Sequence, residues 1–234
     1  MTDPTHTQWR KTLPTLLAVL PCTLVAGCQA QPQGDGHIKT ASASQIAQAR
    51  AQISGLAVKG RSGGDGYSRA LFLPHNRWPA VGHGCTVRDR MVVRDLTHLE
   101  AERKRPCHPV SGILLDPYSG DSLQLGDVEL DHVVALKDAY VKGGRPETFT
   151  PTGRWPTVES MRHALAVDPD NLLMVSGQLN AAKRHADAAS WVPPNKSYRC
   201  TYAVKITIIK ARYKIWVTRA EKSELTRYIA QCPH

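Results

Sequence analysis

The chain has 234 residues and carries 30 Lys and Arg against 20 Asp and Glu, a formal net charge of +10. This length suffices for one domain with a sizeable core, and the two Phe residues exclude a phenylalanine-rich interior. We expect a core of Leu, Val, Ile and Ala with the five Trp and seven Tyr as anchor points, and an anionic partner such as nucleic acid, lipid or an acidic envelope polymer.

The N-terminal residues have the pattern of an export signal. Arg10 and Lys11 precede an apolar run at 12–25, which Pro14 and Pro21 interrupt. The run is shorter than the roughly 20 apolar residues that a transmembrane helix needs, so it predicts a secretory signal peptide.

The end of this run resembles a bacterial lipobox, since residues 24–27 read Leu-Val-Ala-Gly and Cys28 follows. Cleavage there would remove residues 1–27 and leave a lipid on Cys28, which anchors the protein to a membrane. An ordinary signal peptide with an incidental Cys28 is the alternative. The polar residues 28–43 are expected to form a flexible tether, and residues 44–234 a single domain.

Hydrophobic periodicity predicts an α+β domain. Helices are expected at residues 44–56, 135–142, 158–167, 177–185 and 219–229, and strands at 110–115, 122–134 and 172–175. The turn-forming sequence at 116–121 separates the first two strands. Residues 198–213 are expected to be helical, although the β-branched residues within 204–209 leave a strand as the alternative.

Four cysteines remain after the signal and Cys28, namely Cys85, Cys107, Cys200 and Cys232. An even number in an exported chain predicts two disulfides, for which three pairings are open. The local pairing joins the first two and the last two, and each bond would stabilise the fold by ~3 kcal/mol through loop-closure entropy. A zinc site of four thiolates is the alternative, which the absence of any CxxC spacing disfavours.

The residues that can carry chemistry occur in a fixed order. Asp131 and His132 follow an apolar strand pattern, Asn171 precedes the next strand, and Asn180 and Lys183 follow on a predicted helix. This order resembles the active site of HNH nucleases, which are also called ββα-metal or His-Me finger nucleases.

The resemblance extends beyond this motif. The segments at 67–72, 94–96, 116–120, 168–183, 191–193 and 200–202, together with the Asp131-His132 block, are similar to a family of exported bacterial HNH nucleases. The catalytic domain of that family resembles the nuclease part of GmrSD-type restriction enzymes. The resemblance implies a ββα core at about residues 122–192, embedded in additional helices, with DNA as the usual substrate.

The resemblance also assigns roles at the metal site. Asp131 and Asn180 would be oxygen ligands of one divalent ion, Mg²⁺ or Mn²⁺. His132 would be the general base, because the pKa of imidazole lies near neutrality. Asn171 would hold His132 in place through hydrogen bonds to the loop between the strands. Asn180 replaces the last His of the motif, which favours a hard ion over a zinc-type site.

The residues after Asn180 are assigned to the substrate. Lys183, Arg184 and His185 would contact the phosphate. Arg184 and His185 stand where the family pattern has Gly-Asp, which makes the site more basic.

Two further charge groups have structural interpretations. A buried ion network under the site is expected from Arg69, Arg94 and Asp95. A solvated helix face, with a nucleic-acid track as the alternative, is expected from Lys205, Lys210, Arg212 and Lys214.

These observations predict an exported, metal-dependent HNH endonuclease that hydrolyses DNA, with RNA as a further substrate class, and leaves 5′-phosphate ends. It is expected to act as a monomer, and no protein partner can be inferred. The predicted location is the cell envelope, through the lipid on Cys28, at the outer face of the cytoplasmic membrane or in the periplasm, with release as the alternative. A catalytically inactive, envelope-tethered nucleic-acid-binding lipoprotein is the alternative function, and the complete set of Asp131, His132 and Asn180 argues against it.

Overall fold

The computed structural model describes residues 36–102, 105–144 and 158–233. Its contacts divide the chain into Met1–Pro32, which lies outside the described residues, and Gln33–His234. The predicted signal peptide, Cys28 and the first part of the tether therefore lie outside the described residues. No helix within the described ranges combines the length and the apolar sequence of a membrane span.

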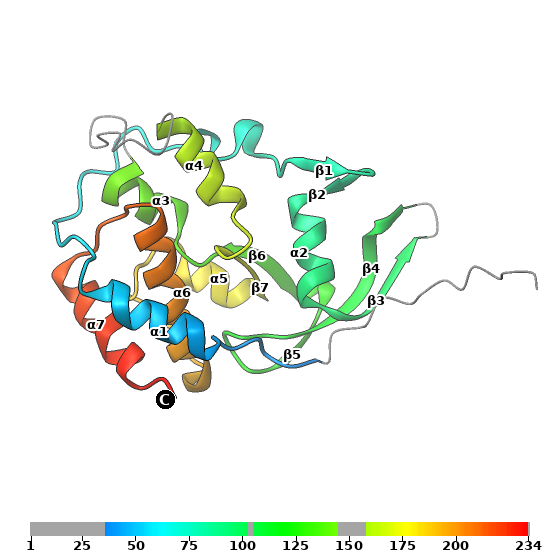
Figure 1. Cartoon of the computed structure of the whole chain (residues 1–234). Coiled ribbons are helices and arrows are strands. Elements are labelled where there is room, and N and C mark those ends of the chain that lie inside the picture. Colours follow the sequence, from blue (N-terminus) through cyan, green and yellow to red (C-terminus); the bar gives the residue numbers. More distant parts are fainter. Residues whose placement is uncertain (1–35, 103–104, 145–157, 234) are drawn as a thin grey trace, which may run out of the picture. The chain divides into compact units, whose positions relative to one another are not determined.

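The described chain combines helices and strands (Figure 1). The helices are α1 (Ala43–Ile53), α2 (Val87–Asp95), α3 (Leu136–Ala139), α4 (Val158–Val167), α5 (Gly177–Lys183), α6 (Arg199–Arg212) and α7 (Arg219–Ala230). The strands are β1 (Ala80–Gly82), β2 (Cys85–Thr86), β3 (Thr97–Glu102), β4 (Arg105–Leu115), β5 (Ser122–Gln124), β6 (Val128–His132) and β7 (Leu172–Ser176). The predicted α+β class is confirmed.

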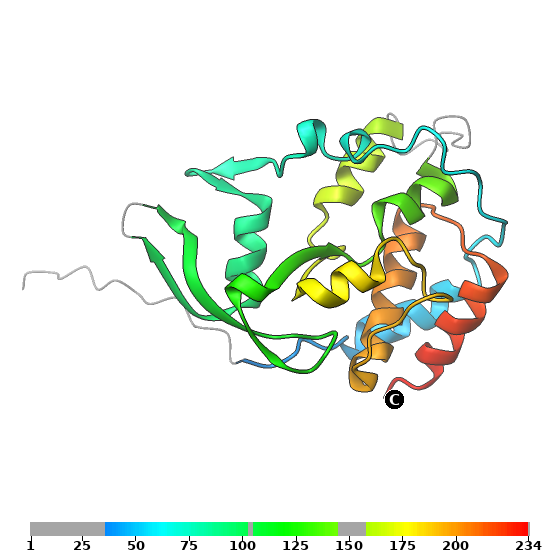
Figure 2. The same ribbon diagram turned by 180° about the vertical axis from the view of Figure 1, so that it is seen from behind.

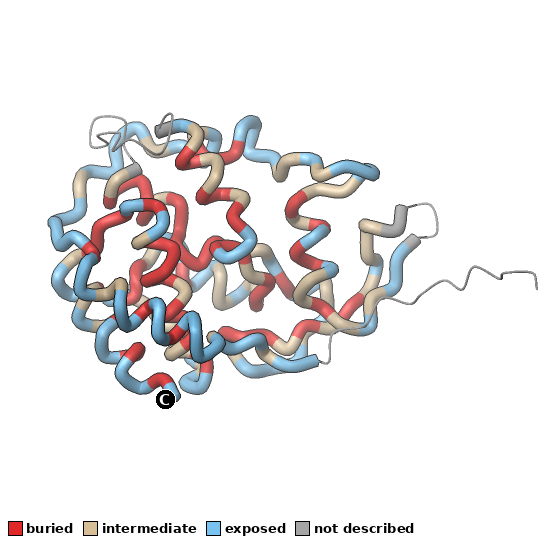
Figure 3. Tube along the Cα trace, in the orientation of Figure 1, coloured by how far each residue is buried: buried red, intermediate tan, exposed pale blue. Residues whose placement is uncertain are grey.

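Helix α6 is the centre of the helical part of the domain. Both α1 and α7 pack against it, and burial extends around most of its circumference between Thr201 and Lys210 (Figures 1 and 3). The β-branched run at 204–209 is therefore helical. Burial of its side chains outweighs a helix-propensity cost that is below roughly 1 kcal/mol per residue.

The strands form three small antiparallel sheets, β1–β2, β3–β4–β5 and β6–β7. The single strand predicted at 122–134 is wrong, because Leu125–Asp127 form a 3₁₀ turn that divides it. The turn contains Gly126 and Asp127, which are poor strand formers. The first part, β5, pairs with β4 across the predicted turn at 116–121, whereas the second part, β6, pairs with β7.

Strands β6 and β7 and helix α5 form the ββα unit that the sequence predicts. The register places His132 opposite Leu172 and Val128 opposite Ser176. Helix α5 follows β7 directly, and the Ser176 side chain caps it by accepting a hydrogen bond from the Leu179 amide. The helix contacts both strands and lies along β6 in Figure 2.

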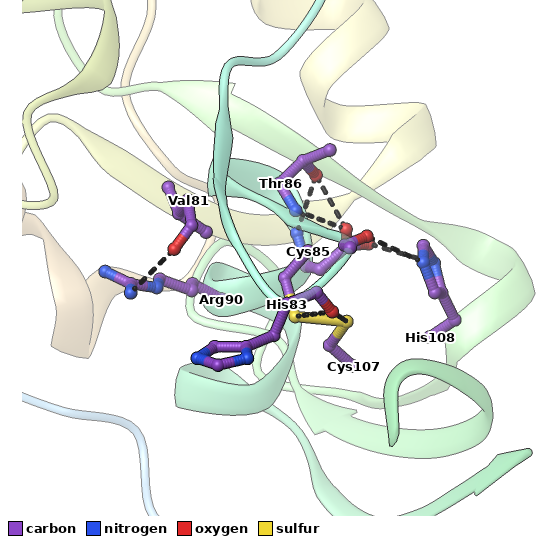
Figure 4. The surroundings of a disulfide bond; sticks show 9 residues. Val81, His83, Cys85, Thr86, Arg90, Cys107 and His108 are labelled. Carbon is purple, nitrogen blue, oxygen red and sulfur yellow. Dashed lines mark hydrogen bonds and ion pairs between the residues drawn. A yellow bond between two sulfur atoms is a disulfide. The ribbon is translucent and has the colours of Figure 1, made fainter. Parts of the chain in front are cut away.

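The two predicted disulfides are confirmed, with the local pairing. Cys85 in β2 is bonded to Cys107 in β4, with Cα atoms 5.6 Å apart (Figure 4). Cys200 in α6 is bonded to Cys232 beyond α7, with Cα atoms 5.2 Å apart. The first bond joins the β1–β2 hairpin to the three-stranded sheet, and the second joins the two C-terminal helices. The alternative of a four-thiolate zinc site is therefore wrong.

A buried ion network connects the segment after α3 with α6 and α7. The Lys142 ammonium lies 2.8 Å from Asp138, 2.5 Å from Asp187 and 2.6 Å from Glu221. The Lys210 ammonium lies 2.8 Å from Asp138 and also pairs with Glu221. Burial alone would raise the pKa of Asp138, but the charges of Lys210 and Lys142 outweigh it and lower that pKa.

The prediction that Lys210 lies on a solvated face is wrong, since its side chain is only 1% exposed. The spacing of lysines along α6 does not reveal that α1 and α7 enclose the helix. Arg212 and Lys214 are exposed as expected, and Arg212 pairs with Asp168 at 2.6 Å.

The ion network expected from Arg69, Arg94 and Asp95 forms only in part. Arg94 pairs with Asp95 at 2.6 Å and donates to the Leu172 carbonyl at 2.7 Å, while Asp95 accepts a bond from the Met174 amide at 3.1 Å. These bonds fasten α2 to β7. Arg69 takes no part in them and lies at the cleft described below.

Replacing Glu221 by Gln should lower the free energy of unfolding by roughly 3–5 kcal/mol, because Lys142 and Lys210 would stay buried with one carboxylate fewer. Glu224→Gln on the same helix is the matched control, since Glu224 pairs with Arg227 at the surface and its loss should change stability little. Urea denaturation of the two oxidised variants measures the difference. Equal stabilities would contradict the network's contribution.

Candidate functional site

A cleft of about 240 Å³ opens at the end of β6. It is lined by Tyr67, Arg69, Leu130, Asp131, His132, Ala135, Leu136, Lys137, Asn180, Arg184 and His185. Five of the predicted site residues therefore share one cleft, whereas Asn171 and Lys183 are buried to 0% and 1% exposure.

The Asp131 carboxylate is 5% exposed and is held from two sides. The Tyr118 hydroxyl donates to Oδ2 at 2.6 Å, and the Lys183 ammonium lies 2.9 Å from each carboxylate oxygen. Burial, and secondly the charge of Asp131, keep the pKa of Tyr118 well above its usual value, so its hydroxyl remains a donor. Tyr118 itself is placed by the 116–121 turn, in which Asp116 accepts a bond from the Tyr118 amide at 3.2 Å.

Lys183 does not reach the cleft, so its predicted contact with a substrate phosphate is wrong. One turn of α5 separates it from Asn180, and at this position its side chain lies against β6. The ammonium donates to the His132 carbonyl at 2.7 Å as well as to Asp131. Lys183 thereby joins α5 to the end of β6 and offsets the charge of Asp131.

The His132 imidazole is 5% exposed and contacts two other segments. Its Nε2 lies 2.9 Å from the Ala166 carbonyl oxygen, and its ring stacks on Trp78 with centroids 5.4 Å apart. Since a carbonyl only accepts, Nε2 carries the hydrogen and Nδ1 keeps its lone pair in the neutral ring. Burial chiefly, with the charges of Arg69 and Lys183, lowers the pKa of His132 to about 3 against the effect of the Ala166 bond. The imidazole is therefore neutral at neutral pH.

The Asn171 side chain fixes the backbone that follows His132. Its Oδ1 accepts a bond from the Val134 amide at 2.7 Å, and its Nδ2 donates to the carbonyls of Val134 and Leu165 at 3.3 and 3.2 Å. The Asn171 carbonyl also accepts a bond from the Val133 amide at 2.8 Å. These are bonds of the kind expected from the sequence, and their effect on catalysis stays a prediction.

Asn180 is one of the residues that line the cleft. Its Nδ2 donates to the Glu129 carboxylate at 2.7 Å. Because a carboxylate only accepts, this bond assigns the amide nitrogen and leaves Oδ1 for a ligand. A Cβ at Gly177 would lie 3.3 Å from Cγ of Glu129, a tight contact that glycine avoids.

The donor atoms suit a hard divalent ion that keeps several water ligands. Asp131 and Asn180 both offer oxygen, which Mg²⁺ and Mn²⁺ prefer. Within the described ranges, no three His, Cys, Asp or Glu side chains gather around one point. Asp131 and Asn180 would thus supply two protein ligands, and water or a bound phosphate would supply the others.

The rim of the cleft is basic, with Arg69, Lys137 and Arg184 on it and His185 beside them. Arg184 ends α5 with a φ of 53°, where a glycine would be free of strain. The resemblance described above led us to expect glycine at this position. Burial and the neighbouring charges of Lys137 and Arg184 lower the pKa of His185.

Several residues of the site were not predicted from the sequence, namely Arg69, Trp78, Tyr118, Glu129 and Lys137. Tyr118 and Arg69 lie in segments that the sequence singled out as a turn, as part of an ion network and for their resemblance to the nuclease family, but neither residue was assigned a role in the cleft. No sequence pattern indicated a role for Trp78 in the site, because its contact with His132 spans more than 50 residues of chain.

Comparison with known proteins identifies the family to which the chain belongs. The family described as GmrSD restriction endonucleases, C-terminal domain, matches residues 87–228. A protein of Arthroderma benhamiae described as an uncharacterized secreted protein is 34% identical over 221 residues, which cover 93% of this chain and 98% of the relative. No solved structure matches the chain.

The two asparagines of the site should respond differently to the same substitution. Asn171→Ala should lower the free energy of unfolding by roughly 2–4 kcal/mol, because it leaves buried backbone groups without partners. Asn180→Ala should cost less than about 1 kcal/mol, since that side chain is partly exposed at the cleft. Urea denaturation in EDTA measures both, and equal losses would show that Asn171 does not have the structural role described.

Proposed function

Because the chain belongs to the family of GmrSD restriction endonuclease C-terminal domains, we propose that it is an exported, metal-dependent endonuclease that hydrolyses DNA. The observation that carries this proposal is the presence of Asp131, His132 and Asn180 in one cleft with a basic rim. They come from the end of one strand and the helix of the ββα unit, and offer a base and two oxygen ligands. A base and a metal ion held side by side can together activate water and offset the charge that develops on a phosphodiester.

His132 is the proposed general base. Its Nδ1 would accept a proton from the attacking water, since Nε2 is engaged with Ala166. With a pKa of about 3 the imidazole is always neutral near pH 7, but it is a weak base. The negative charge of a bound phosphate beside the ring would raise this pKa and strengthen the base.

Asp131 and Asn180 would hold the ion, with Mg²⁺ or Mn²⁺ as the best fit to their oxygen atoms. When bound, the ion would supply positive charge that offsets the charge developing on the phosphate oxygens. Lys183 and Tyr118 hold the Asp131 carboxylate in a single orientation. Since Lys183 already offsets the charge of Asp131, the substrate phosphate would contribute much of the attraction for the ion.

Arg69, Lys137, Arg184 and His185 would contact the substrate backbone. Cationic side chains supply most of the sequence-independent affinity for nucleic acid. Hydrolysis with the ion and base arranged in this way is expected to leave 5′-phosphate ends, and RNA is a further substrate class to be tested.

The location outside the cytoplasm is supported by two observations. The two disulfides form in oxidising compartments, and the Arthroderma benhamiae relative is described as secreted. We further propose a lipid anchor on Cys28, which rests on the sequence at 24–28 alone. The intact mass of the mature protein tests it, and an unmodified Cys28 would contradict it.

The oxidised protein should cut supercoiled plasmid with Mg²⁺ or Mn²⁺ and should not cut it in EDTA. His132→Ala should lower the rate by about 10²–10⁴-fold, because the general base is lost. His37→Ala, which removes an exposed histidine away from the cleft, is the matched control and should cut at the wild-type rate.

Cutting by His132→Ala at the wild-type rate would contradict the assignment of the base. Salt-sensitive binding of DNA without cleavage of DNA or RNA under any metal condition would instead favour the inactive nucleic-acid-binding lipoprotein.

A further inference from the structure

The His132 imidazole is held at two places by segments outside the ββα unit. The Nε2 bond to Ala166 fixes one atom of the ring but leaves rotation about that bond free. The Trp78 indole lies nearly parallel to the ring, at an interplanar angle of 21° and a centroid distance of 5.4 Å. A hydrogen bond and a stacked ring together fix both the position and the plane of the imidazole.

Trp78 is itself firmly placed. The Arg69 guanidinium lies 5.6 Å from its ring centroid, within cation–π range. The indole packs against both hydrophobic clusters of the domain. The hairpin that follows it is tied to α2 by a bond of 3.0 Å from the Val87 amide to the Pro79 carbonyl, and to β4 by the Cys85–Cys107 disulfide.

The geometry of Trp78 fits a role toward His132 better than a role toward a nucleobase. Trp78 is half-buried, its ring is engaged with His132 and lies 5.6 Å from the Arg69 guanidinium, and other side chains line the cleft. Arg69 and Trp78 also precede residues 87–228, which the family match covers. They belong to a part of this chain outside the matched nuclease domain.

We propose that Trp78 is a positioning residue that holds the plane of the His132 imidazole, so that Nδ1 meets the attacking water in the cleft. The proposal rests on the proposed nuclease function. It predicts that loss of the stack slows the chemical step without weakening the substrate complex, because Trp78 does not line the cleft.

The test compares Trp78→Leu, which removes the stack, with Trp78→Phe, which keeps an aromatic face. Plasmid cleavage by the oxidised protein should show kcat lowered about 10–100-fold in Trp78→Leu with KM changed less than about 3-fold, the size expected for a misplaced catalytic group. Trp78→Phe should stay within a few-fold of the wild-type kcat. Trp216→Leu is the matched control, since Trp216 is buried away from the cleft and donates to the Gly60 carbonyl at 2.9 Å.

A second readout does not depend on activity or metal. In the protein labelled with ¹³C-histidine and kept in EDTA, the ring protons of His132 should show the ring-current shift of an indole stacked on them. His132→Asn assigns the signal by its disappearance. The shift should be lost in Trp78→Leu, retained in large part in Trp78→Phe, and unchanged in Trp216→Leu.

The outcomes separate the two proposals. Wild-type kcat in folded Trp78→Leu, a loss confined to KM, or a His132 signal that does not move would overturn the positioning role while leaving the nuclease assignment intact. Wild-type cutting by His132→Ala would overturn the nuclease assignment whatever the His132 signal does. If Trp78→Leu fails to fold, nuclear Overhauser contacts between the indole and imidazole protons of the wild-type protein decide, and their absence overturns the proposal.

Discussion

The bonds of Lys183 to Asp131 and to the His132 carbonyl are the interaction on which the geometry of the cleft depends. The ammonium of α5 reaches the last two residues of β6 and is 0% exposed. Asn180 lies one turn earlier on the same helix, so its distance from the Asp131–His132 pair follows from this contact. A buried lysine and carboxylate keep their positions because separation would leave an uncompensated charge in the interior. Lys183 therefore joins the helix that carries Asn180 to the Asp131–His132 pair, although these residues are far apart in the sequence.

Elements outside the ββα unit complete the cleft. Tyr118 orients Asp131 from the turn between β4 and β5, and Trp78 stacks on His132 from the segment before β1. The buried network around Lys142 and Glu221 fixes the helical part of the domain, and the Cys85–Cys107 bond fixes the hairpin beyond Trp78. These covalent and ionic connections hold the cleft residues in place even though the strands are short and α3 has only four residues.

Local sequence patterns predicted most elements and the central motif, because helix periodicity and motif order are properties of neighbouring residues. Helix α4 matches its predicted bounds, and the cleft contains Asp131, His132 and Asn180 as expected. The strand predicted at 122–134 failed for a local reason, the turn at Leu125–Asp127, whereas the errors at Lys183 and Lys210 concern long-range packing. The patterns place Lys183 and Lys210 on helix faces, but whether a face meets solvent or carboxylates depends on elements far along the chain. The contact of Trp78 with His132 likewise joins residues that are far apart in the chain.

The most direct test of this account is the position of the metal ion. Crystals of His132→Ala with a short DNA duplex and Mn²⁺ would hold the substrate uncut, and anomalous scattering would locate the manganese. We predict one manganese peak in contact with the Asp131 carboxylate, the Asn180 amide oxygen and a DNA phosphate. Manganese bound elsewhere on the protein, or bound DNA without manganese at Asp131 and Asn180, would contradict it.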